Sequence, residues 1–204
     1  VAHGHHHCRA LAARNELELA GQYLTAAQDW EGVLDLARHH GRGLFERGEH
    51  TLIADWLTAL PDELRQSRID VFISWAIVMI ITGRTLVADD AIGELQERQP
   101  LTPWQEAITE ALRASMVQWH MPPGRALASG RRALECVDAI GPDDQSRDLI
   151  GLASVSFIRV SALLSISRAW DLLGERDQAR AALTECVAAA EGVYLVWLIN
   201  ALSS

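Results

Sequence analysis

Apolar residues recur at helical spacing on both sides of a short turn, Thr82-Gly83-Arg84, within residues 72–100. Upstream of the turn the apolar set is Phe72, Trp75, Ala76 and Met79, and downstream it is Leu86, Ala88, Ile92 and Leu95. Spacings of three or four residues place each set along one face of a helix. Gly83 can adopt the left-handed conformation that ends a helix, and Pro100 stops the second helix. The pattern predicts two antiparallel helices that approach closely at the small side chains of Ala76 and Ala88.

This stretch resembles a tetratricopeptide hairpin, which has a small residue in its first helix, a turn glycine, an alanine five residues later and a final proline. Gly174 and Ala179 repeat the glycine-to-alanine spacing, which predicts a second hairpin between a long or kinked helix within 145–174 and a partner over 175–191. Such a hairpin cannot bury its apolar faces alone. The expected fold is therefore all-α, a right-handed superhelix of antiparallel helix pairs, or tetratricopeptide-like α-solenoid.

Other periodic segments predict helices elsewhere in the chain, over residues 15–28, 30–48, 49–60, 103–119 and 123–140. Asp29 is expected to cap the second of these helices, and Thr102 followed by Pro103 to begin the fourth. Gly41 lies inside the second helix and costs about 1 kcal/mol relative to alanine, unless a neighbour needs the room. We expect residues 1–67 to form an N-terminal helical segment and residues 68–204 the repeats, with 192–204 opening a further repeat.

Charge and motif content argue against several functions. The chain has 27 acidic and 18 basic residues and a net charge of −9, which is unfavourable for direct contact with nucleic acid. It has no lysine and therefore no GxxxxGK phosphate loop. The carboxylate pairs Asp89/Asp90 and Asp143/Asp144 have no apolar surroundings to separate their pKa values, and no serine lies in a GxSxG elbow. We expect neither an enzyme nor a bound cofactor.

The histidines and cysteines leave more than one interpretation open. The sequence HGHHHC at residues 3–8 could hold a metal, or it could be a tag remnant or a polar helix start. No second ligand pair follows at zinc-finger spacing, so no metal site is predicted. Cys8, Cys136 and Cys186 have no CxxC partner, which favours reduced thiols and a cytoplasmic location. The apolar run at 71–81 is too short to cross a bilayer, so no membrane contact is expected.

Residues 29–84 resemble the MalT-like members of the LuxR superfamily, which are large ATP-dependent bacterial transcription regulators. The resemblance rests on Asp29-Trp30-Glu31, the Gly48 turn, the Trp56–Pro61 run and Thr82-Gly83-Arg84, and His7 and Ala10 also fit the family's His-x-x-Ala pattern. It implies an effector-sensing helical region between an ATPase domain and a C-terminal DNA-binding domain. The chain would then be a fragment of a longer protein. A small-molecule inducer or a regulatory protein would bind its concave face and permit self-association. The alternative is a tetratricopeptide-like scaffold that docks only protein partners.

Candidate ligand contacts form a polar stripe on the otherwise apolar helix within 145–174. The stripe comprises Ser161, Ser165, Arg168 and Asp171, which are three or four residues apart. Charged and hydroxyl groups suit a hydroxyl-rich or anionic effector, and Trp170 could stack beside them. The stripe could instead be a solvated face. Trp104 and Trp119 could also stack on a flat ligand, whereas Trp30, Trp56 and Trp75 are expected in the core.

Overall fold

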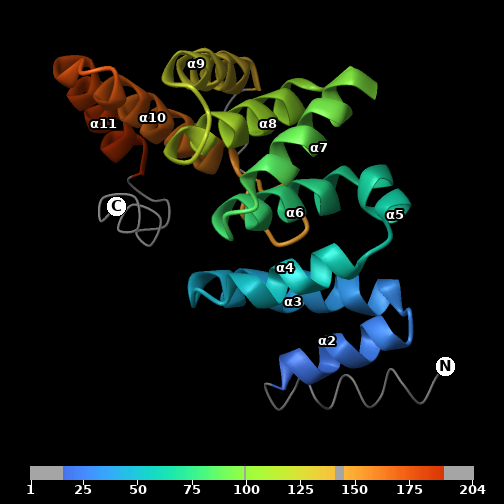
Figure 1. Cartoon of the computed structure of the whole chain (residues 1–204). Coiled ribbons are helices and arrows are strands. Elements are labelled where there is room, and N and C mark those ends of the chain that lie inside the picture. Colours follow the sequence, from blue (N-terminus) through green and yellow to red (C-terminus); the bar gives the residue numbers. More distant parts are fainter. Residues whose placement is uncertain (1–15, 99, 141–144, 191–204) are drawn as a thin grey trace. The chain divides into compact units, whose positions relative to one another are not determined.

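The computed structural model describes residues 16–98, 100–140 and 145–190, and these residues contain helices and no strand (Figure 1). The all-α class is thus confirmed for the described part of the chain, while the superhelical arrangement stays a prediction. The elements in order are α2 (Leu17–Ala26), α3 (Trp30–Glu46), α4 (His50–Ala59), α5 (Asp62–Ser67), α6 (Ile69–Ile81), α7 (Thr85–Arg98), α8 (Pro103–Ser115), the 3-10 helix η1 (Met116–Gln118), α9 (Pro123–Ile140), α10 (Val155–Leu172) and α11 (Arg176–Ala190).

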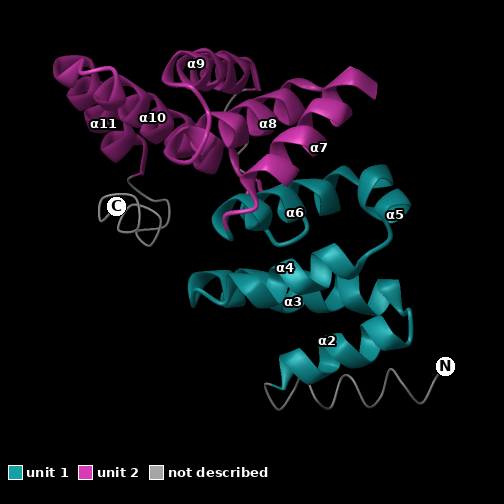
Figure 2. Ribbon diagram, viewed as in Figure 1, with its two compact units in different colours: residues 1–82, 147–152 teal, residues 83–146, 153–204 magenta. Residues whose placement is uncertain are grey.

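The chain divides into two compact units (Figure 2). Unit 1 comprises residues 1–82 and 147–152, and unit 2 comprises residues 83–146 and 153–204. A short segment late in the sequence therefore belongs to the first unit. The expected boundary after residue 67 falls inside unit 1, between α5 and α6. Because α6 and α7 lie in different units, the predicted approach of Ala76 and Ala88 stays a prediction.

Unit 1 is a stack of short helices in which α3 packs against α2 and α4, and α6 packs against α4 and α5. As predicted, Asp29 begins α3, since its carboxylate accepts a 3.1 Å hydrogen bond from the Gly32 N–H. The helix α6 is buried around its circumference, which explains why it is apolar on all sides. Glycine at position 21 is required by close packing, because a Cβ there would lie 2.0 Å from Trp56 Nε1.

Unit 2 is built around α10, which packs against α8, α9 and α11. As predicted, Thr102 caps α8 and Pro103 follows it, and the structure adds a capping box with reciprocal bonds between Thr102 and Gln105. The α10–α11 pair is the second predicted hairpin, and its turn contains Gly174 with φ of +82°. The Ser167 hydroxyl donates a 2.8 Å bond to the Ala179 carbonyl, which ties these two helices together.

Three features differ from the sequence-based expectations. The helix predicted within 145–174 begins only at Val155, and residues 147–152 are irregular. Leu86 was expected on the inward face of its helix, but 64% of its surface is exposed. The helix predicted to reach residue 119 ends as an α-helix at Ser115 and continues as one 3-10 turn. None of the described helices is both long and apolar enough to span a membrane.

Candidate functional site

The predicted polar stripe on α10 is only partly accessible to solvent. Ser161 and Ser165 are buried, and the Ser165 hydroxyl donates a 2.7 Å bond to the Ser161 carbonyl of its own helix. Arg168 is half-buried and Asp171 is exposed. Both serine side chains therefore lie in the interior of unit 2, and only the C-terminal half of the stripe can contact a ligand.

Trp170 does not lie beside this stripe. Residues 168 and 170 are separated by about 200° around a helix axis, because each residue turns the helix by about 100°. The guanidinium carbon of Arg131, on α9, lies 5.5 Å from the centre of the Trp170 ring. This cation–π contact occupies one face of the ring. The structure thus brings Arg168 and Asp171 together on one side of α10 and places Trp170 on another.

The remaining tryptophans separate into core and surface positions. Trp56 and Trp75 are buried as expected, and Trp30 is half-buried. Trp104 was a candidate for ligand stacking but is 4% exposed, so its ring packs in the core of unit 2. Trp119 is 48% exposed. Of the tryptophans considered for stacking, Trp119 offers the largest accessible surface.

A polar network between α7 and α8 was not predicted from the sequence. Arg113 Nε donates a 3.0 Å bond to Asp89 Oδ1, and Arg113 also bonds Gln96. His120, which follows η1, contacts α7, with Nδ1 3.1 Å from the Thr85 hydroxyl and Nε2 3.7 Å from Asp89 Oδ2. This spatial arrangement of a hydroxyl, an imidazole and a carboxylate resembles a nucleophilic hydroxyl group with its general base. Thr85 is buried, however, which makes the network a structural link between helices rather than an exposed reactive group.

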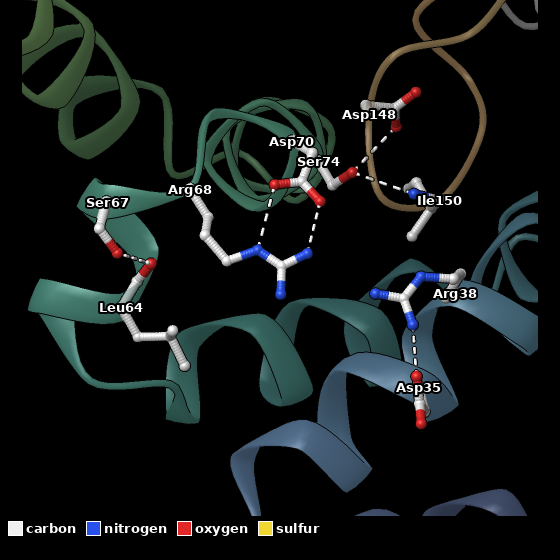
Figure 3. A network of polar contacts seen from close by, with 9 residues as sticks. All are labelled: Asp35, Arg38, Leu64, Ser67, Arg68, Asp70, Ser74, Asp148 and Ile150. Atoms are coloured by element: carbon white, nitrogen blue, oxygen red, sulfur yellow. Dashed lines mark hydrogen bonds and ion pairs between the residues drawn. The ribbon is translucent and has the colours of Figure 1, made fainter.

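A second network lies in unit 1, around the start of α6 (Figure 3). Arg68 donates two hydrogen bonds to the Asp70 carboxylate, from Nε to Oδ1 at 3.3 Å and from Nη2 to Oδ2 at 2.7 Å. Burial alone would raise the pKa of Asp70, but the hydrogen bond and charge of Arg68 and two backbone N–H groups outweigh it and leave the pKa below its ordinary value of 3.8. The hydrogen bond to Asp70 correspondingly raises the pKa of Arg68.

The same network includes a buried contact that joins distant parts of the sequence. The Ser74 hydroxyl donates a 2.9 Å bond to Asp148 Oδ2 and accepts a 3.2 Å bond from the Ile150 N–H. Both Ser74 and Asp148 are buried. The sequence offered one signal for this contact, a lone serine within the apolar run at 71–81, but nothing that identified its partner.

The described residues contain no group of three metal-ligating side chains. The histidine-rich sequence at residues 3–8 lies outside the described residues. Cys136 and Cys186 are buried, and burial raises the pKa of both thiols. Raised pKa values keep these cysteines as neutral thiols near pH 7, which suits core packing better than nucleophilic chemistry.

We compared the chain with protein-family models, curated proteins and solved structures, and found no match in any of the three. The likeness of residues 29–84 to MalT-like regulators is therefore still a prediction from the sequence motifs.

Proposed function

We propose that the chain is the effector-sensing helical region of a MalT-like LuxR-family transcription regulator. In this role it binds a small-molecule inducer or a regulatory protein and transmits the event to separate ATPase and DNA-binding domains of a longer chain. Self-association would follow from binding. The proposal supposes that the chain itself neither catalyses a reaction nor contacts DNA.

The observation that supports this proposal most is the position of the motif residues that carry the family resemblance. Asp29 caps α3. Gly48, with φ of +78°, lies between α3 and α4, and Pro61 follows the last residues of α4. Gly83, with φ of +80°, separates α6 from α7. Each residue begins, ends or separates helices, which is what a shared helical architecture requires of it.

The effector contacts that we propose are Arg168 and Asp171. Neither side chain takes part in an ion pair among the described residues, so their charges remain available to a ligand. They lie at the end of α10, next to the exposed side chains of Leu172 and Leu173. Opposite charges beside apolar surface suit a polar ligand that also has an apolar face, such as a sugar.

A thermal-shift screen of small metabolites, beginning with sugars, tests the proposal. A ligand that binds the native state raises the unfolding temperature by mass action. The shift should be lost in the double variant Arg168→Ala with Asp171→Ala. It should persist in the matched control Arg180→Ala with Glu185→Ala, which removes two exposed charges from α11. Equal shifts in both double variants would place the ligand elsewhere on the chain.

A protein-docking scaffold is the second candidate, and one observation favours it. Two neighbouring large apolar side chains at the turn of the α10–α11 hairpin are exposed, namely Leu172 and Leu173. Exposed apolar side chains that cluster often mark a protein interface. A scaffold predicts that no small metabolite shifts the unfolding temperature, and that Leu172→Ser with Leu173→Ser abolishes binding of a protein partner.

A further inference from the structure

Residues 147–152, which we call the strap, pack into unit 1 although the helices before and after them, α9 and α10, belong to unit 2. The strap is irregular, and its backbone groups are bonded by helices far away in the sequence. The Leu149 N–H donates a 3.1 Å bond to the Asp70 carbonyl, and the Ile150 N–H bonds the Ser74 hydroxyl. Figure 3 shows the strap lying beside α6 at these contacts.

Side chains add selectivity to this docking. Asp148 accepts a hydrogen bond from the Ser74 hydroxyl through Oδ2 and one of 2.8 Å from the Leu152 N–H through Oδ1. The carboxylate thus stabilises a turn within the strap and also attaches the strap to α6. From α3, Arg42 donates a longer bond of 3.4 Å to the Gly151 carbonyl. These bonds come from two helices and fix both the backbone and one acidic side chain of the strap.

The apolar side chains of the strap fit unit 1 equally closely. Leu149, Ile150 and Leu152 are all buried, and Ile150 is 2% exposed. Ile150 lies over Gly41 of α3, where a Cβ would come within 2.5 Å of Ile150 Cγ2. A glycine inside a helix costs about 1 kcal/mol relative to alanine. Gly41 leaves room for the Ile150 side chain, which accounts for a glycine at this position inside α3.

We propose that the strap is an internal peptide ligand of unit 1, a latch that binds through the sequence Asp-Leu-Ile-Gly-Leu and can be released while unit 1 stays folded. Main-chain bonds from a fixed surface, with pockets for alternate side chains, are how proteins recognise extended peptides. A tethered ligand has an effective concentration on the order of millimolar, so a weak site suffices to hold it. Release would remove the contacts of the strap with α3 and α6. The proposal rests on the contacts of unit 1 alone and does not depend on the regulator role.

Hydrogen exchange read by mass spectrometry tests whether the latch opens separately. Local opening needs less free energy than global unfolding. The amides of Leu149, Ile150 and Leu152 should therefore exchange faster than those of α6, at denaturant concentrations where unit 1 stays folded. Exchange of the strap only together with α6 would show that the strap is an inseparable part of the core, and would overturn the proposal.

A peptide in trans tests whether the site recognises the sequence. The probe is a fluorescent peptide with the sequence of residues 146–154. The receiver is the full 204-residue chain carrying Asp148→Ala and Ile150→Ala, which disables its own strap and leaves α3 and α6 unchanged. The receiver should bind the peptide saturably and at least about tenfold more tightly than the unaltered chain, whose strap competes.

Two controls decide how that binding is interpreted. Adding Gly41→Val to the receiver should abolish binding, because the new side chain occupies the position of Ile150. A peptide in which alanine replaces its aspartate should bind at least about tenfold more weakly, since it loses the bond to Ser74. A folded receiver that ignores the peptide would overturn the proposal. So would a receiver that no longer unfolds cooperatively, because the strap would then be a core element.

Discussion

The hydroxyl of Ser74 donates a 2.9 Å hydrogen bond to the carboxylate of Asp148, a residue 74 positions later in the chain. The same oxygen accepts the Ile150 N–H, so one side chain satisfies an acidic group and a backbone donor together. Buried polar groups without partners are costly, and a buried carboxylate especially so. The contact explains why an otherwise apolar helix has a serine at this position.

Replacing Ser74 by alanine should lower the free energy of unfolding by about 1–3 kcal/mol, because the buried carboxylate of Asp148 and the Ile150 N–H both lose a partner. Urea denaturation measures this change. Ser67→Ala is the matched control, since the Ser67 hydroxyl bonds the Leu64 carbonyl at an exposed site, and it should change stability by less than about 0.5 kcal/mol. Equal denaturation midpoints for the two variants would show that the Ser74 contact contributes nothing.

Gly83→Val should destabilise the protein by about 1–2 kcal/mol, because a side chain at φ of +80° strains the backbone. No atom lies within 4 Å of the position that a Cβ would take, so a steric clash does not contribute. Gly124 has equally open surroundings and no positive φ, and Gly124→Val should therefore be close to neutral. A neutral Gly83→Val, measured by thermal or urea unfolding, would contradict the role of Gly83 in ending α6.

The ion pair between Arg68 and Asp70 should make the free energy of unfolding depend on pH in the acidic range. The pKa of Asp70 is lower in the folded protein than its ordinary value of 3.8. Its contribution is therefore present above about pH 4 and is lost as the pH falls through the folded pKa. Unfolding free energy measured between pH 5 and pH 2, as an order-of-magnitude window, should fall less steeply in Asp70→Asn. Arg68→Gln should have the same effect, because it removes the guanidinium that lowers the pKa of Asp70. Unchanged slopes in both variants would contradict this assignment.

Local signals in the sequence predicted much of the helical framework. Asp29 and Thr102 cap helices where expected. The turn glycines Gly83 and Gly174 adopt the positive φ for which glycine is suited. The helix predicted over 123–140 begins and ends at those residues. These successes share a cause, since caps and turns depend on residues only a few positions apart.

Hydrophobic periodicity does not predict contacts between residues that are distant in the sequence. The strap is rich in apolar residues, a pattern that predicts a helix, but the N–H groups of Leu149 and Ile150 bond Asp70 and Ser74 instead of a preceding turn. Periodicity likewise did not predict the burial of part of the candidate polar stripe. Helical spacing placed Ser161 in line with Arg168 but gave no sign that neighbouring helices bury the serine. Trp170 was expected to stack beside the polar stripe, whereas its helical phase and its contact with Arg131 place it elsewhere.

The isolated chain should neither hydrolyse ATP nor bind duplex DNA at physiological salt. The reasons are the missing phosphate loop and the net charge of −9. Fluorescence anisotropy with a labelled duplex and a phosphate-release assay measure the two activities. Saturable, salt-sensitive DNA binding at submicromolar protein would contradict the expectation for nucleic acid. ATP turnover that survives removal of contaminating ATPases would contradict the expectation for catalysis.

The response of transcription to inducer tests the central claim, that this chain senses an effector through Arg168 and Asp171. The measurement uses the full-length regulator carrying Arg168→Ala and Asp171→Ala, with Arg180→Ala and Glu185→Ala as the matched control. We predict that the first double variant requires at least about tenfold more inducer for half-maximal transcription, because each lost charged hydrogen bond weakens binding. The control should respond like the unaltered protein. If the first variant folds and its response keeps the same midpoint and amplitude, the claim is contradicted.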